Sequence, residues 1–215
     1  MVRRGACARR SRRLWDRLRS GWTLTLLLGA GCSASGEERP VNTPPKLLLA
    51  EFKAYCLDTQ LKMDEVSAKA KAAGLDAIGE SSSEAPVQMR KTMWGHDMGD
   101  LRMVVSAGTL HTPKEPNFPA FDSRQCMVMS FADYGEVLSA ARAWVGIAPT
   151  TTTSHSSTFN YTIVDSKRLP LPNEDDPASL AALAEARLWS FIVEQDKDGH
   201  VQVSLTRFKQ AQEAP

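Results

Sequence analysis

Residues 45–59 read PKLLLAEFKAYCLDT, and this stretch determines the expected fold. Apolar side chains recur there at helical spacing while lysine and acidic side chains take the opposite face, which predicts an amphipathic helix with Cys56 on or beside its buried side. Cys126 is the one other cysteine in the region expected to fold. We therefore expect a disulfide between Cys56 and Cys126; a catalytic thiol at Cys56, near Asp58, is the alternative.

The N-terminal segment is strongly basic. Residues 1–31 contain eight arginines and one acid, a net charge of +7, whereas residues 32–215 have 18 basic and 24 acidic side chains, a net charge of −6. The apolar run GWTLTLLLGAG at 21–31 is too short to span a membrane and is typical of a signal peptide; a basic surface helix or nucleic-acid arm is the alternative. The acidic remainder lacks the basic balance that nucleic-acid binding requires, so nucleic acid is not an expected partner.

The apolar run ends in Leu28-Gly29-Ala30-Gly31-Cys32, which resembles the lipobox of bacterial lipoproteins. The resemblance implies a signal peptide of residues 1–31, a lipid on Cys32 and a proline-containing tether of residues 32–45. Gly29 departs from the family pattern, which has a branched aliphatic residue three positions before the cysteine. Ordinary signal-peptidase cleavage within 32–36 and release of a soluble periplasmic protein is the alternative.

Residues 46–210 are expected to form one α+β domain, followed by a frayed tail at 211–215. A capping box at Asp133, an apolar stripe and Gly146 predict the best-defined helix, and Asp198-Gly199 between apolar runs predicts a hairpin. The order of elements predicts a mainly antiparallel sheet of about five strands with helices on one face. The expected helices are 45–59, 63–73, 134–145 and 177–186, the expected strands are 101–108, 125–131, 159–165, 188–194 and 201–208, and loops are expected at 77–91, 109–124 and 149–158.

Candidate catalytic residues are few. His96 lies beside Asp97 and near Asp100, and these groups could act as an acid–base set or as metal ligands, although a solvated turn is the preferred interpretation. Neither a serine-nucleophile motif nor a glycine-rich phosphate loop occurs. We expect no cofactor and no metal ion.

Two further patterns have structural interpretations. Residues 194–201 resemble the first eight positions of a calcium-binding EF-hand loop, but Leu205 stands where that loop has its bidentate glutamate, so a plain hairpin turn is preferred. Trp94, Trp144 and Trp189 could line a binding groove, but tryptophans at such spacing usually belong to the core.

The stretch Phe52-x-x-Tyr55-Cys56-Leu57-Asp58-Thr59, together with Gln125-Cys126-Met127-Val128, resembles an uncharacterised family of exported proteobacterial proteins. Those proteins have a cysteine on an early helix, a second helix that ends at glycine, and a second cysteine on a strand. The similarity covers residues 48–145. It implies this architecture and export, but no activity.

Three functional hypotheses follow. The preferred one is a non-catalytic cell-envelope lipoprotein, a tethered binding or assembly module that faces the periplasm, with the membrane as one partner and an envelope protein or toxin as another. The second is a periplasmic hydrolase-like enzyme that uses His96 with Asp97 or Asp100. The third is an inhibitor or immunity factor that acts through its long loops. A pocket that joins a histidine to a carboxylate would favour the second, and a protruding 109–124 loop the third.

Overall fold

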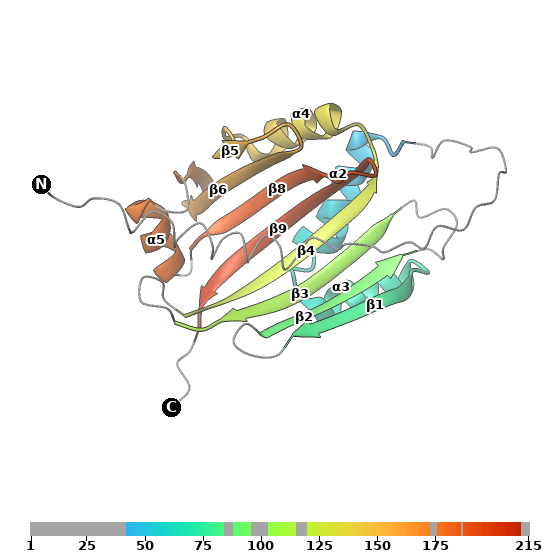
Figure 1. The fold of residues 1–215 in the computed structure, drawn as a ribbon, viewed down its shortest axis with the longest axis horizontal. Helices are drawn as coiled ribbons and strands as arrows, with labels where there is room; N and C mark the ends of the chain where they lie inside the picture. The colour runs from blue at the N-terminus through green and yellow to red at the C-terminus, as the bar shows by residue number, and fades with distance from the viewer. Residues whose placement is uncertain are drawn as a thin grey trace, which may run out of the picture. The chain divides into compact units, whose positions relative to one another are not determined.

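A computed structural model describes residues 42–83, 88–95, 103–114, 120–172, 176–185 and 187–211, which lie in one compact unit, 40–215. They form an α+β fold in which helices pack on an antiparallel open sheet (Figure 1). The helices are α2 (Pro45–Phe52), the π-helical turn η1 (Lys53–Leu57), α3 (Met63–Ala72), α4 (Tyr134–Val145) and α5 (Pro177–Ala184). The strands are β1 (Asp76–Ser83), β2 (Gln88–Gly95), β3 (Val104–Thr112), β4 (Phe121–Phe131), β5 (Thr151–Thr152), β6 (Ser156–Val164), β7 (Lys167–Pro170), β8 (Trp189–Gln195) and β9 (His200–Gln210).

The sheet is larger than the sequence predicts. Its order is β1-β2-β3-β4-β9-β8-β6-β5, with β7 also paired to β6, so nine described strands replace the expected five or so. The segment 77–91, expected to be a loop, contributes β1 and the start of β2. Residues 149–158 contain β5 and the start of β6. The α+β class and the antiparallel pairing are confirmed.

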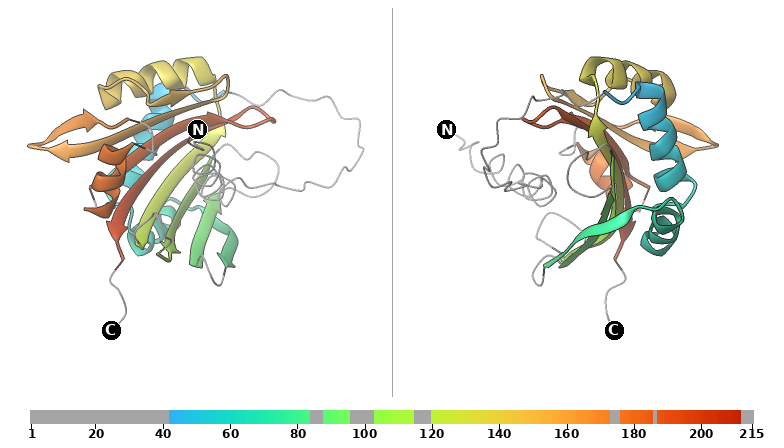
Figure 2. Two further views of the ribbon diagram at one scale, coloured as in Figure 1. Left: turned by 60° about the vertical axis from the view of Figure 1, so that its left-hand side comes forward. Right: turned by 90° about the vertical axis from the view of Figure 1, so that its right-hand side faces the viewer.

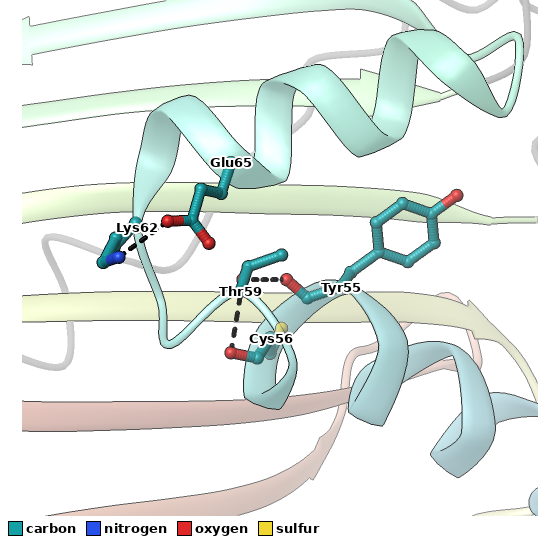
Figure 3. A network of polar contacts seen from close by, with 5 residues as sticks. All are labelled: Tyr55, Cys56, Thr59, Lys62 and Glu65. Carbon is teal, nitrogen blue, oxygen red and sulfur yellow. Dashed lines mark hydrogen bonds and ion pairs between the residues drawn. The ribbon is translucent and has the colours of Figure 1, made fainter.

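The first helix carries the disulfide. Asp58 N–H donates to the carbonyl of Lys53, and this wider turn places both Tyr55 and Cys56 in the core. Thr59 Oγ1 donates to the carbonyl oxygens of Tyr55 and Cys56, at 2.6 Å and 3.4 Å, where the chain turns toward α3 (Figure 3). The predicted Cys56–Cys126 disulfide is present, with the two Cα atoms 5.4 Å apart.

One face of the sheet is covered by α2, α3 and α4, as expected, whereas α5 lies apart from them and packs against β9 (Figures 1 and 2). The main core lies between those three helices and the sheet. Phe52 of α2 meets Trp144 of α4 and Phe191 of β8, with ring centroids 6.0 Å and 5.5 Å away. Asp133 caps α4 by accepting from Glu136 N–H, and Gly146 ends it with φ of 76°, as the sequence predicts.

Two hairpins differ from their expected form. Strands β3 and β4 pair from Val104–Met129 to Thr112–Phe121, so residues 109–112 and 121–124, half of the expected 109–124 loop, are strand. The β6–β7 hairpin turns at Asp165 and Ser166, both with positive φ, and its ribbon extends beyond the neighbouring strands (Figure 2).

Candidate functional site

A cleft of 990 Å³ opens at one end of the sheet, among the ends of β2, β3, β4 and β9. Arg90, Arg124, Arg207 and Lys209 supply positive charge, and we call this site the cationic cleft. The described residues that line it are Ser83, Gln88, Met89, Arg90, Thr109, Leu110, His111, Asp122, Ser123, Arg124, Arg207 and Lys209.

The register of the sheet assembles the cleft from distant parts of the chain. Arg90 lies opposite Thr109, Thr109 opposite Arg124, and Arg124 opposite Arg207, so these four residues form one row across four strands. Gln88, His111, Asp122 and Lys209 form the next row in the same way. Because directly opposite residues project from the same side of an antiparallel sheet, both rows present their side chains to one surface.

The cationic cleft lies on the helix-covered face, immediately beyond the core. Side chains alternate along a strand, so Arg124 shares its face with Cys126, two residues on, which is joined to η1. Cys126 is fully buried between Ala107 and Leu205, whereas Arg90, Arg124 and Arg207 are exposed. The helices therefore cover the sheet as far as the row of Ala107, Cys126 and Leu205, and the next row on this face contains the arginines.

The charges of the cleft are unbalanced. Among the described lining residues there are four cationic side chains and one carboxylate, Asp122, although residues 32–215 as a whole are acidic. Asp122 Oδ1 lies 2.7 Å from His111 Nδ1. Within the described parts of the chain, Arg90, Arg124, Arg207 and Lys209 join no ion pair. Like charges directly opposite each other destabilise a sheet, so an anion bound between Arg124 and Arg207 would remove an unfavourable contact.

Aromatic side chains continue the arginine row. Trp189 lies opposite Arg207, whose guanidinium carbon is 5.1 Å from the indole centroid, and Tyr161 follows on the next strand. The rings of Tyr161 and Trp189 are parallel within 3°, with centroids 6.5 Å apart. Trp189 thus has a guanidinium beside it on one neighbouring strand and a parallel ring on the other, and its contact with Arg207 helps to hold that side chain in place.

Arg168, on β7, lies opposite Ile163, outside this row, but its guanidinium reaches the Tyr161 ring. Its guanidinium carbon lies 4.4 Å from the Trp144 ring centroid and 5.6 Å from that of Tyr161. It donates to the carbonyl oxygens of Trp144 and Val145, at 3.0 Å and 3.2 Å, and so satisfies the C-terminal end of α4. Burial raises the pKa of Tyr161, and the nearby Arg168 opposes that rise. Arg168 therefore has a structural role.

The cleft is equipped to bind anions. Guanidinium groups present paired N–H donors that match a carboxylate or a phosphate, and three arginines stand here in one row. Among the described lining residues, His111 and Asp122 form an acid–base pair. In the residues that the structure describes, His111 hydrogen-bonds to Asp122 and to no serine, threonine or cysteine side chain. The described groups thus supply charge recognition but no activated nucleophile.

Several residues singled out from the sequence are not part of the cationic cleft as the structure describes it. Cys32, His96, Asp97 and Asp100 lie outside the described residues. Trp94 is buried, and Trp144 and Trp189 are partly buried against the core.

The EF-hand-like segment is a hairpin turn. Asp196 Oδ1 accepts from the backbone N–H of Asp198 and of His200, and Asp196 Oδ2 lies 2.9 Å from His200 Nδ1. The carboxylate at the centre of that segment is therefore occupied with holding the β8–β9 turn. No group of three or more His, Cys, Asp or Glu side chains in the described ranges is arranged to hold a metal ion.

Sequence reasoning missed all four cations of the cleft. Arg90 stands in a segment that was expected to be a loop, and an exposed arginine or lysine on a strand is ordinary by itself. The available signal was alternation: Arg124 and Arg207 each lie two residues from a buried residue, Cys126 and Leu205, on the same face. Only the register shows that these positions are neighbours.

Comparisons with protein-family models, with curated proteins and with solved structures find no match. Among the described residues, no helix has both the length and the apolar composition that a membrane crossing would need.

Proposed function

We propose that this protein is a non-catalytic binding module of the bacterial cell envelope that binds an anionic ligand in the cationic cleft. The observation that carries this proposal is the row of Arg90, Arg124 and Arg207, which has no neutralising acid among the described side chains. Arginine forks in a solvent-accessible cleft recognise carboxylates and phosphates. Positive charge gathered at one site of an acidic chain is costly unless it serves binding.

The proposed location has separate support. A disulfide persists in an oxidising compartment, and Cys56 and Cys126 form one inside the domain. The basic segment, the apolar run and Cys32 are what an exported lipoprotein would carry. Cys32→Ala should release the protein from the membrane fraction of its host cells, and incorporation of labelled fatty acid should be lost. If the wild-type chain takes up no label, the soluble periplasmic alternative replaces the lipid-anchored one.

Anion binding is tested by calorimetry with inorganic phosphate, citrate and polyphosphate as probes. Arg124→Gln and Arg207→Gln should each weaken binding of the preferred probe about tenfold, the effect of losing a charged hydrogen bond. Arg142→Gln is the matched control, because Arg142 is exposed on α4, outside the cleft, and the substitution removes the same charge. If the cleft variants and the control behave alike, the cleft is not the binding site.

A hydrolase-like enzyme is a second candidate, since the cleft does bring a histidine and a carboxylate together at 2.7 Å. The pair is His111 with Asp122, rather than His96 with Asp97 or Asp100. His111→Gln separates the two proposals, because it would abolish hydrolysis of an ester or phosphoester bound in the cleft while leaving the arginine row intact. The inhibitor hypothesis has less support, because half of the expected 109–124 loop is strand.

A further inference from the structure

We infer that the ligand of the cationic cleft is an acidic polysaccharide, an extended chain with repeated carboxylates and free hydroxyl groups. This inference rests on the proposed anion-binding function and narrows it to one class of ligand. Three features of the cleft carry it: the spread of the arginines, the mixture of donors and acceptors, and the absence of an open aromatic face in the described lining.

The arginines are spread too widely for one small anion. Arg124 and Arg207 lie on neighbouring strands, while Arg90 lies two strands beyond Arg124, so Arg90 and Arg207 are separated by three strand spacings, roughly 14 Å. Side chains stand roughly perpendicular to a sheet, which keeps their charged ends apart. A single carboxylate or phosphate between Arg124 and Arg207 would leave Arg90 unused. A chain with repeated anionic groups would use all three.

The lining also requires hydrogen-bond donors from the ligand. The carboxylate of Asp122 accepts hydrogen bonds, and a carboxylate has about four lone-pair sites, of which His111 occupies one. Thr109 lies in the arginine row, and Gln88 in the adjacent one. These groups match the hydroxyls of a sugar, which donate as well as accept. Polyphosphate offers no donor and would be repelled by Asp122.

Single-stranded nucleic acid meets the charge requirement but not the stacking requirement. Proteins that bind single strands combine a basic groove with aromatic side chains on which bases stack. No phenylalanine, tyrosine or tryptophan is among the described lining residues of the cleft. Trp189, the nearest ring in the row, lies beside Arg207 and parallel to Tyr161, which is only 2% exposed. The described lining of the cleft therefore offers no aromatic ring on which a base could stack.

The experiment measures binding of defined probes to the purified full-length chain by calorimetry. The probes are galacturonate monomer, a galacturonate hexamer, a neutral galactose hexamer and polyphosphate and single-stranded DNA of matched charge. We expect the galacturonate hexamer to bind at least about tenfold more tightly than every other probe. Arg90→Gln should weaken hexamer binding about tenfold and leave monomer binding unchanged, whereas Arg142→Gln should change neither.

Each other outcome has a definite meaning. If the monomer binds as tightly as the hexamer and Arg90→Gln has no effect, the site takes a single anion, and the polysaccharide inference fails while anion binding stands. If polyphosphate or DNA binds more tightly than the hexamer, the ligand class is wrong. If no probe binds, both proposals fail. Arg90→Lys, which keeps the charge but loses the paired donors, should give an intermediate affinity and serves if Arg90→Gln does not fold.

Discussion

Arg124 and Cys126 project from the same face of β4, two residues apart, yet Cys126 is fully buried and Arg124 is exposed. The boundary between the core and the cationic cleft therefore falls between them. Cys56 reaches Cys126 from η1, so the disulfide attaches the end of the helix layer to the last core row before the cleft. The same bond thus stabilises the domain and sets the edge of the site.

The disulfide should account for a large part of the stability. Its cysteines are 70 positions apart, and removing a crosslink that closes a loop of this size costs about 4 kcal/mol in the chain-entropy description. Cys56→Ala with Cys126→Ala should lower the free energy of unfolding by that order, as measured by urea denaturation. A reductant should lower the stability of the wild type and leave the double variant unchanged. Equal stability of the two proteins in the absence of reductant would contradict this prediction.

Arg124 should lower the free energy of unfolding of the domain. It lies directly opposite Arg207, and like charges in that position destabilise a sheet by up to about 1 kcal/mol. Arg124→Gln should therefore raise the free energy of unfolding by a few tenths of a kcal/mol while it weakens anion binding. Such an exchange of stability for binding is typical of functional residues. Urea denaturation beside Arg142→Gln checks the sign, and a loss of stability specific to Arg124→Gln would show that Arg124 is structural.

The sequence predicts those helices and strands that bury one face and expose the other, because such elements have a regular apolar pattern. The helix α4 and the Asp198-Gly199 hairpin follow from apolar periodicity or a local turn signal, the cysteine pairing follows from there being two cysteines in the region expected to fold, and all three are present. The β1 strand, DAIGESSS, is mostly exposed at the edge of the sheet and so has no apolar alternation to detect. The β2 strand was missed because a lysine, Lys91, stands at one of its buried positions. The β7 strand was missed because it has only four residues and ends in proline.

The cleft could not be predicted, because its residues become neighbours only through pairing of β2, β3, β4 and β9. Arg124 and Arg207 are 83 positions apart in the sequence, and no local pattern connects them. Their alternation with Cys126 and Leu205 shows which face each occupies once the register is known. Strand order is set by tertiary packing, which the sequence pattern alone does not reveal.

Trp189 should act on anion binding through Arg207. The indole carries no charge, but Arg207 lies over it at 5.1 Å and is held by that contact. Trp189→Leu should weaken binding by roughly two- to fivefold, as expected for loss of an exposed cation–π contact. The slope of log affinity against log salt should not change, because the number of charges is the same. Trp189→Phe keeps a ring beside Arg207 and should retain most of the affinity; if both variants bind alike, Trp189 has no such role.

Lys91 should make stability depend on alkaline pH. Burial lowers the pKa of Lys91 from 10.5 to about 8, so between these values the folded protein loses a proton that the unfolded chain retains. The unfolded state then binds more protons, and the free energy of unfolding should rise with pH across this window, by at most about 3 kcal/mol. Below the folded pKa both states are protonated and this contribution does not vary. Urea denaturation between pH values of about 7 and 10 should show the rise in the wild type and in the exposed-site control Lys197→Met, but not in Lys91→Met. A rise of equal size in Lys91→Met would assign the effect to other groups.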